Sequence, residues 1–153
     1  MTTTIRPATT HPAMARTSGR AAVRLVIAQT TLVGVDAVGG ILAVAAGVNT
    51  WAEAWGPTAL LAAPLPMVAG QAVLTYLAVA TLRRWGAAPA VLLALACFVS
   101  IASGFFDGGL GNARLGAWLT AYQVLLLVVT GVVGLLALTR ARELTRRPEI
   151  SAP

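Results

Sequence analysis

The sequence predicts an all-α integral membrane protein, an antiparallel four-helix transmembrane bundle with both termini in the cytoplasm. Of its 153 residues, 58% are hydrophobic and 10% are charged, whereas soluble domains have about 25% charged residues. The mean hydropathy is +0.80, and the charges cluster in short segments between long apolar windows. No segment alternates with the period of two that a transmembrane barrel strand requires. Helices that span a bilayer therefore account best for the composition.

The chain begins with a polar, Thr-rich segment, residues 1–20, which we expect to be a disordered cytoplasmic tail. The first span follows at about residues 25–48, or about 36 Å of helix against a hydrocarbon core of about 30 Å. The alternative is a secretory signal peptide that is cleaved after Ala45. Signal cores usually have about 7–15 apolar residues and carry no acid such as Asp36, so we favour the retained helix.

Three further apolar windows complete the predicted transmembrane domain, residues 21–139. The second window has two prolines in its first turn, where the missing N–H groups cost least, and it ends at an Arg-Arg-Trp-Gly sequence. Residues 140–153 then form a basic cytoplasmic tail. We place the three spans at residues 64–82, 87–106 and 115–139.

The distribution of arginine predicts how the chain threads through the membrane. If the N-terminus is cytoplasmic, all of the 11 basic residues except Arg114 lie on the cytoplasmic side, as the positive-inside rule requires. The net charge of +6 does not indicate a nucleic-acid partner, because the arginines flank apolar runs and form no basic stripe. The lipid bilayer is the predicted partner, and the Ala-, Gly-, Val- and Arg-rich composition suggests a bacterial inner membrane.

Each predicted span carries a stripe of small and polar residues at spacings of three and four. Lipid tails supply no hydrophobic drive between helices, so such stripes mark the faces that pack together. We therefore expect these faces inside the bundle and the Leu- and Val-rich faces against lipid. The stripes are Gln29, Val33, Asp36, Gly40, Ala43 and Gly47; Met67, Gln71, Thr75 and Ala78; Leu93, Ala96, Ser100, Ser103 and Asp107; and Gly116, Thr120, Gln123, Leu127, Thr130 and Gly134.

Asp36 is the acid in the middle of the first span and the main candidate for a functional residue. An acid near the centre of a transmembrane helix costs about 2.5–3.5 kcal/mol to insert. Counting along the helices puts Tyr76 and Thr75 at the same depth, and we predict Tyr76 as its hydrogen-bond partner, with Thr75 second. No basic residue shares this depth, so desolvation favours the neutral carboxyl.

A polar layer is predicted nearer the outer surface, where Gln71, Ser100 and Gln123 reach a similar depth and bond one another. Two roles are open for Asp36. It binds a proton or a ligand in a cavity opened by Gly39 and Gly40, or it bonds across the bundle and fixes the packing.

A second candidate site lies in the Gly-rich turn before the fourth span, where Asp107, Asn112 and Arg114 either stabilise an ordinary loop or capture a ligand. No catalytic, cofactor-binding or metal-ligating set is predicted. The single histidine is His11 in the tail, and the single cysteine is Cys97 inside a span.

Two functions fit these features. The first is a non-catalytic protein that acts by packing, as a homo-oligomer or as an accessory subunit of a larger membrane protein, and the stripes on every span favour it. The alternative is a small transporter or proton-coupled carrier that works through Asp36. An acid inside a membrane is costly to insert, and such residues usually have a function, which favours this alternative.

Overall fold

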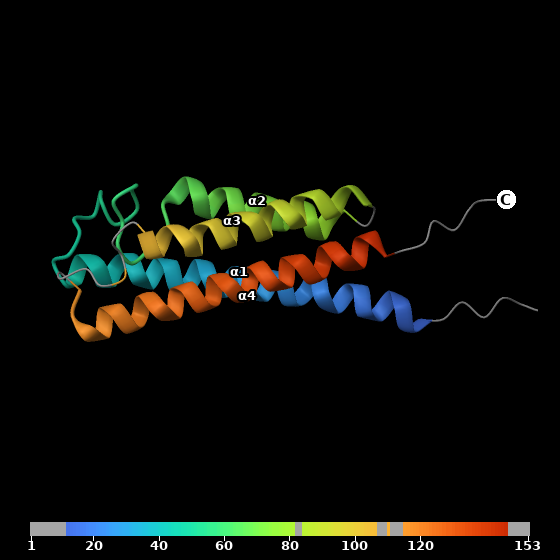
Figure 1. Cartoon of the computed structure of the whole chain (residues 1–153), viewed down its shortest axis with the longest axis horizontal. Helices are drawn as coiled ribbons and strands as arrows, with labels where there is room; N and C mark the ends of the chain where they lie inside the picture. Colours follow the sequence, from blue (N-terminus) through green and yellow to red (C-terminus); the bar gives the residue numbers. More distant parts are fainter. Residues whose placement is uncertain (1–11, 82–83, 107–109, 111–114, 147–153) are drawn as a thin grey trace, which may run out of the picture.

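Four α-helices lie side by side in the computed structural model, which describes residues 12–81, 84–106, 110 and 115–146 (Figure 1). They are α1 (Pro12–Ala45), α2 (Leu65–Ala80), α3 (Ala87–Phe106) and α4 (Ala117–Thr145), and a short 3₁₀ turn, η1 (Arg84–Gly86), precedes α3. The described residues contain no strand. The all-helical prediction is therefore confirmed.

Three of the helices are long and apolar enough to cross a membrane: α1 over Gly19–Ala45, α3, and α4. The bounds of α3 are those predicted for the third span. In contrast, α2 has 16 residues, or about 24 Å of helix, and is shorter than a hydrocarbon core of about 30 Å. The structure thus supports a membrane-embedded protein with three helices of spanning length and one shorter apolar helix.

Two helices extend beyond the predicted apolar spans. α1 begins at Pro12, within the segment expected to be a disordered tail, and α4 ends at Thr145, within the predicted basic tail. Proline is tolerated in the first turn of a helix, where its missing N–H has no intrahelical partner in any case. Hydropathy marks only the apolar part of a helix, so the polar ends were missed. Residues 1–11 and 147–153 lie outside the described residues.

Small residues let α3 and α4 approach closely. A Cβ atom on Gly134 would lie 3.1 Å from the Cβ of Cys97, and one on Gly104 would lie 3.1 Å from Leu127. Gly131 faces Ile101 in the same way. Helices in a membrane associate through such small-residue contacts, because close backbone approach maximises van der Waals packing.

The connection from α1 to α2, residues 46–64, is called the α1–α2 loop here. It starts with a Schellman motif: Gly47 has a φ of +67°, and the N–H of Val48 donates to the carbonyl of Ala43. Thr50 and Glu53 then form reciprocal backbone-to-side-chain hydrogen bonds at 2.8 and 3.4 Å, as in a capping box. The side chain of Asn49 bonds two backbone groups further along the loop. These bonds satisfy the backbone of a loop that packs against the helices.

At the opposite end of the molecule, η1 packs on α4, with Gly86 against Leu144. Arg140 of α4 is 0% exposed there, and its Nε donates to the carbonyl of Ala78 in α2 at 3.3 Å. Glu143 lies 3.6 Å from its guanidinium group. A basic side chain at the C-terminal end of a helix stabilises carbonyls that have no intrahelical partner. Arg140 was predicted only as part of the basic tail, so the structure assigns it a packing role that the sequence did not indicate.

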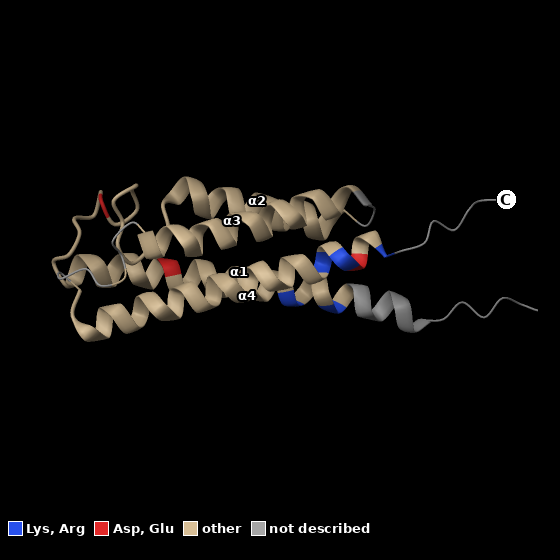
Figure 2. Cartoon of the chain, viewed as in Figure 1, with Lys and Arg blue, Asp and Glu red and all other residues tan. Residues whose placement is uncertain are grey.

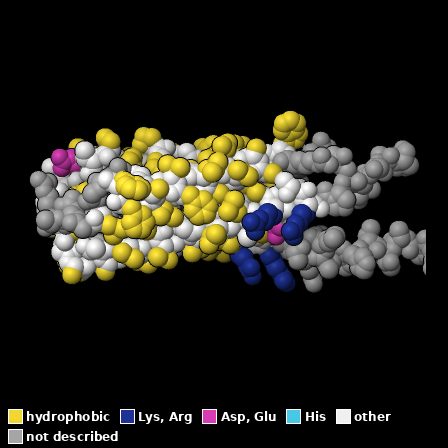
Figure 3. Space-filling model, in the orientation of Figure 1, with side chains coloured by type: hydrophobic (Ala, Val, Ile, Leu, Met, Phe, Trp, Pro, Cys, Tyr) yellow, Lys and Arg dark blue, Asp and Glu magenta, His cyan; other side chains and the backbone are white. Residues whose placement is uncertain are grey.

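The described charges lie near the two ends of the molecule, except for Asp36, which lies along α1 (Figure 2). Between the ends, many exposed apolar side chains lie on the face seen in Figure 3, and exposed large apolar residues occur on all four helices. A belt of this kind is what lipid tails would contact.

Candidate functional site

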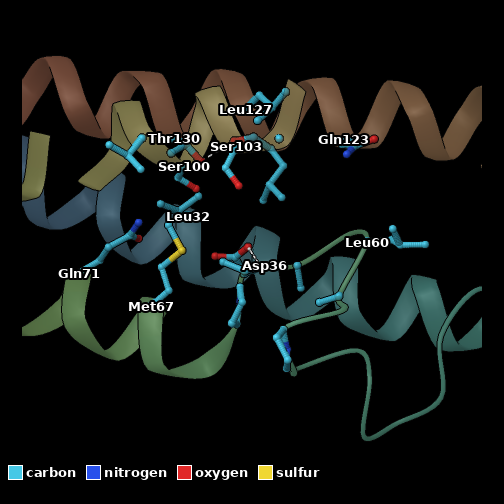
Figure 4. Close-up of a pocket in the computed structure, with 18 of the residues that line it drawn as sticks. Leu32, Asp36, Leu60, Met67, Gln71, Ser100, Ser103, Gln123, Leu127 and Thr130 are labelled. Atoms are coloured by element: carbon cyan, nitrogen blue, oxygen red, sulfur yellow. Dashed lines mark hydrogen bonds between the residues drawn. The ribbon is translucent and has the colours of Figure 1, made fainter. Parts of the chain in front are cut away.

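A cavity of about 440 Å³ lies between the four helices and beneath the α1–α2 loop (Figure 4). All four helices and the loop contribute to its wall, and it opens to the surface of the molecule beside Val99 and Ser103, which are exposed. Its polar lining comes from one carboxyl group, two amides and several hydroxyls. Its lining side chains include Leu32, Asp36, Thr58, Met67, Gln71, Val99, Ser100, Ser103, Gln123, Leu126, Leu127 and Thr130.

Asp36 projects from α1 into this cavity and is only 3% exposed (Figure 4). Its Oδ1 accepts a hydrogen bond of 3.0 Å from the backbone N–H of Ala63. Ala63 belongs to the last part of the α1–α2 loop, just before α2 begins. The carboxyl group therefore holds the loop to the middle of α1 and also forms part of the cavity wall.

The two glycines that follow Asp36 provide the surface on which the loop rests. The carbonyl oxygen of Leu61 leaves no room for a Cβ atom on Gly39, and the ring of Trp55 lies 2.8 Å from where a Cβ of Gly40 would be. Neither glycine lines the cavity. The prediction that this pair opens a cavity is therefore wrong, because the loop fills the space that the missing side chains leave.

Tyr122 of α4 is a further member of this region that the sequence did not indicate. Its hydroxyl donates a hydrogen bond of 2.6 Å to the carbonyl of Val35, the residue before Asp36. Its ring also lies 3.0 Å from where a Cβ of Gly39 would be. Tyr122 thus links α4 to α1 beside the acid. It belongs to no predicted stripe, and its amphipathic ring gave no separate signal.

Of the predicted polar site, Gln71, Ser100 and Gln123 do line the cavity together with Asp36. Both amides are buried, and the Oε1 of Gln123 has no hydrogen-bond partner among the described residues. The expected polar layer therefore surrounds a cavity instead of closing on itself through direct bonds.

The predicted partners of Asp36 take other positions. Tyr76 is 70% exposed, and Thr75 is buried but does not line the cavity. Neighbouring residues on a helix point about 100° apart, so a helix that turns Thr75 inward turns Tyr76 outward. The prediction that Tyr76 is the partner of Asp36 is wrong, and the backbone of Ala63 takes that place.

The second candidate site cannot be placed, since Asp107, Asn112 and Arg114 lie outside the described residues. Within the described part of the chain, no group of three or more His, Cys, Asp or Glu side chains could hold a metal ion. The cavity at Asp36 is therefore the site that the geometry presents for a ligand.

Comparison with protein-family models, curated proteins and solved structures finds no match to this chain.

Proposed function

We propose that the chain is a four-span inner-membrane protein that binds a small solute in its central cavity, as the binding step of a small carrier, with Asp36 as the recognising residue. The observation that carries the proposal is a buried acid in the wall of a cavity that all four helices share. An ionisable group inside a membrane is costly, and such groups mark substrate and ion pathways.

The dimensions of the cavity support this proposal. Its volume of about 440 Å³ falls within the range of about 300–1,000 Å³ that is typical of small-molecule sites. Such sites combine mostly apolar walls with a few polar groups that orient the ligand. Here Leu32, Met67 and Leu127 supply apolar surface, while Asp36 and Gln123 supply buried polar atoms.

The proposed threading is antiparallel, with both termini on the cytoplasmic side. The contacts of Gly104 with Leu127 and of Cys97 with Gly134 support it for α3 and α4, because the residue number falls along one helix as it rises along the other. Exposed arginines gather at the end of the molecule where α1 begins and α4 ends (Figure 3), which agrees with the positive-inside rule. In this arrangement α2 and the adjoining part of the α1–α2 loop together make the second crossing.

The packing role inferred from the sequence now has less support. It relied on stripes of small and polar residues, and most of their members are buried within the chain itself, among them Ala43, Ala78 and Gly134. These side chains are not available to a second protein. We therefore place solute binding before a role as a homo-oligomer or accessory subunit, and we assign no catalytic step.

Access to the cavity tests the proposal. A Ser100→Cys variant in a Cys97→Ala background would be treated, in lipid nanodiscs, with the small neutral reagent methyl methanethiosulfonate. Ser100 lines the cavity, whereas the native Cys97 is fully buried between α3 and α4. We expect the thiol at position 100 to react at least about tenfold faster than Cys97 in the native chain. Equal protection of both thiols would mean that solutes do not reach the cavity, and the proposal would fail.

A further inference from the structure

We infer that the solute is a small organic cation that carries an ammonium group on an apolar body. This inference rests on the proposed solute-binding function. Three features of the cavity lead to it: the sign of its charge, its unused acceptor, and its apolar wall.

The charge of the site is set by Asp36. No Lys, Arg or His is among the described residues that line the cavity. Among the residues that the structure describes, Tyr122 of α4 is the titratable side chain close to Asp36, and its hydroxyl already donates to the carbonyl of Val35. From α2, α3 and the loop, the cavity receives amides, hydroxyls and apolar groups. An anionic solute would therefore meet a carboxyl group with no cation to offset it, whereas a cationic solute supplies the missing counter-charge.

The acceptors of the site also favour a donor-rich solute. The N–H of Ala63 occupies one oxygen of Asp36, and the Oε1 of Gln123 is buried without a partner. A buried acceptor that lacks a donor is unfavourable. An ammonium group carries three donors and no acceptor, so it can donate hydrogen bonds to the carboxyl group and to other acceptors of the wall.

The apolar wall distinguishes an organic cation from a bare metal ion. Leu32, Met67, Val99 and Leu127 line a volume of about 440 Å³, far more than one ion and its ligands fill. The described residues include no carboxylate or histidine cluster of the kind that a metal ion requires. A body of several carbon atoms would bury these side chains' exposed surface.

The test compares three methanethiosulfonate reagents of similar size on the Ser100→Cys, Cys97→Ala protein in nanodiscs: the cationic aminoethyl, the neutral hydroxyethyl and the anionic sulfonatoethyl forms. Each rate is divided by the rate with a free thiol. With Asp36 present, we expect the cationic reagent to react at least about tenfold faster than the anionic one. Hexylammonium should slow the reaction of the cationic reagent, and 1-hexanol should not.

An Asp36→Asn variant should lose the preference for the cationic reagent. Its amide oxygen still accepts from Ala63, and a thermal unfolding curve would verify that it folds. If the neutral reagent reacts and the cationic one shows no preference, the cavity is open but the inference about the cation is overturned. If none of the three reagents reacts, the proposed function itself fails. Tyr76→Phe changes an exposed side chain outside the cavity and is the control that should keep the wild-type preference. If Asp36→Asn does not fold, the comparison of the three reagents on the protein that keeps Asp36 still decides the inference.

Discussion

The carbonyl oxygen of Leu61 lies directly on Gly39, with no room for a Cβ atom between the loop and the helix. The loop is thus seated on α1 at a position that only glycine allows, a few residues from the hydrogen bond between Asp36 and Ala63.

Replacing Gly39 with Ala should therefore destabilise the protein. The added methyl group meets a backbone atom that cannot rotate away, so the loop must move, and overpacking of this kind costs about 1–3 kcal/mol. Gly34→Ala is the matched control on the same helix, because a Cβ there meets nothing within 4 Å. It should be neutral or stabilise by up to about 1 kcal/mol through helix propensity. Unfolding in mild detergent, followed by circular dichroism, measures both; equal stability of the two variants would contradict the seating of the loop.

Removing the hydroxyl of Tyr122 should weaken the link between α4 and α1. Tyr122→Phe loses the 2.6 Å bond to the carbonyl of Val35, and a typical hydrogen bond contributes about 0.5–1.5 kcal/mol to the free energy of unfolding. Tyr76→Phe removes the same atom from an exposed ring and should change stability by less than about 0.5 kcal/mol. Denaturant titration of the two variants gives the difference, and an equal loss from both would show that the buried bond contributes nothing.

Arg140 should be far more sensitive to substitution than its neighbour Arg142. Arg140→Met leaves the carbonyl of Ala78 without its donor and Glu143 without its ion pair, and we expect a cost of about 1–3 kcal/mol. Arg142 is exposed on the same helix, and Arg142→Met should cost less than about 0.5 kcal/mol. Both variants lose one positive charge. If both lower the melting temperature by a similar amount, the loss is due to the charge and not to the buried contact of Arg140.

The proposed threading predicts which side of the membrane each end of the molecule faces. In a Cys97→Ala background, Trp51→Cys in the exposed part of the α1–α2 loop should react with an impermeant maleimide added to intact cells. Arg146→Cys, at the end of α4, should react only after the membrane is opened. The reverse pattern would show that the topology is the opposite of the one proposed. Labelling of both positions in intact cells would show that the chain crosses the membrane an even number of times between them, so that α2 and its loop do not form a crossing.

The helices themselves were largely predictable from the sequence. The apolar window at residues 87–106 matches α3, because a basic turn and a Gly-rich turn bound it sharply. Helical periodicity also identified the buried faces: Gln71, Thr75 and Gln123 all point inward. Where the boundary residues are polar, as in the first turns of α1, hydropathy gave no signal although the helix continues.

The candidate site was predictable only in part. Periodicity and depth brought Asp36, Gln71, Ser100 and Gln123 to one region, and the structure places them around one cavity. The partner of Asp36 was missed because it is a backbone N–H, which every non-proline residue carries and no sequence pattern distinguishes. Counting depth along separate helices also assumes that the loops lie on the surface. The α1–α2 loop instead folds back against α1 and buries Leu61.

The shortness of α2 has a consequence for the lipid around the protein. α2 has 16 residues, about 24 Å of helix, while the span within α1 has 27, or about 40 Å. A bilayer thins beside a helix that is shorter than its hydrocarbon core, whereas a longer helix tilts or thickens the bilayer around it. Each adjustment costs fractions of a kcal/mol for each Å of mismatch. The length of the lipid chains is therefore expected to affect the stability of the protein in a bilayer through the short α2 flank.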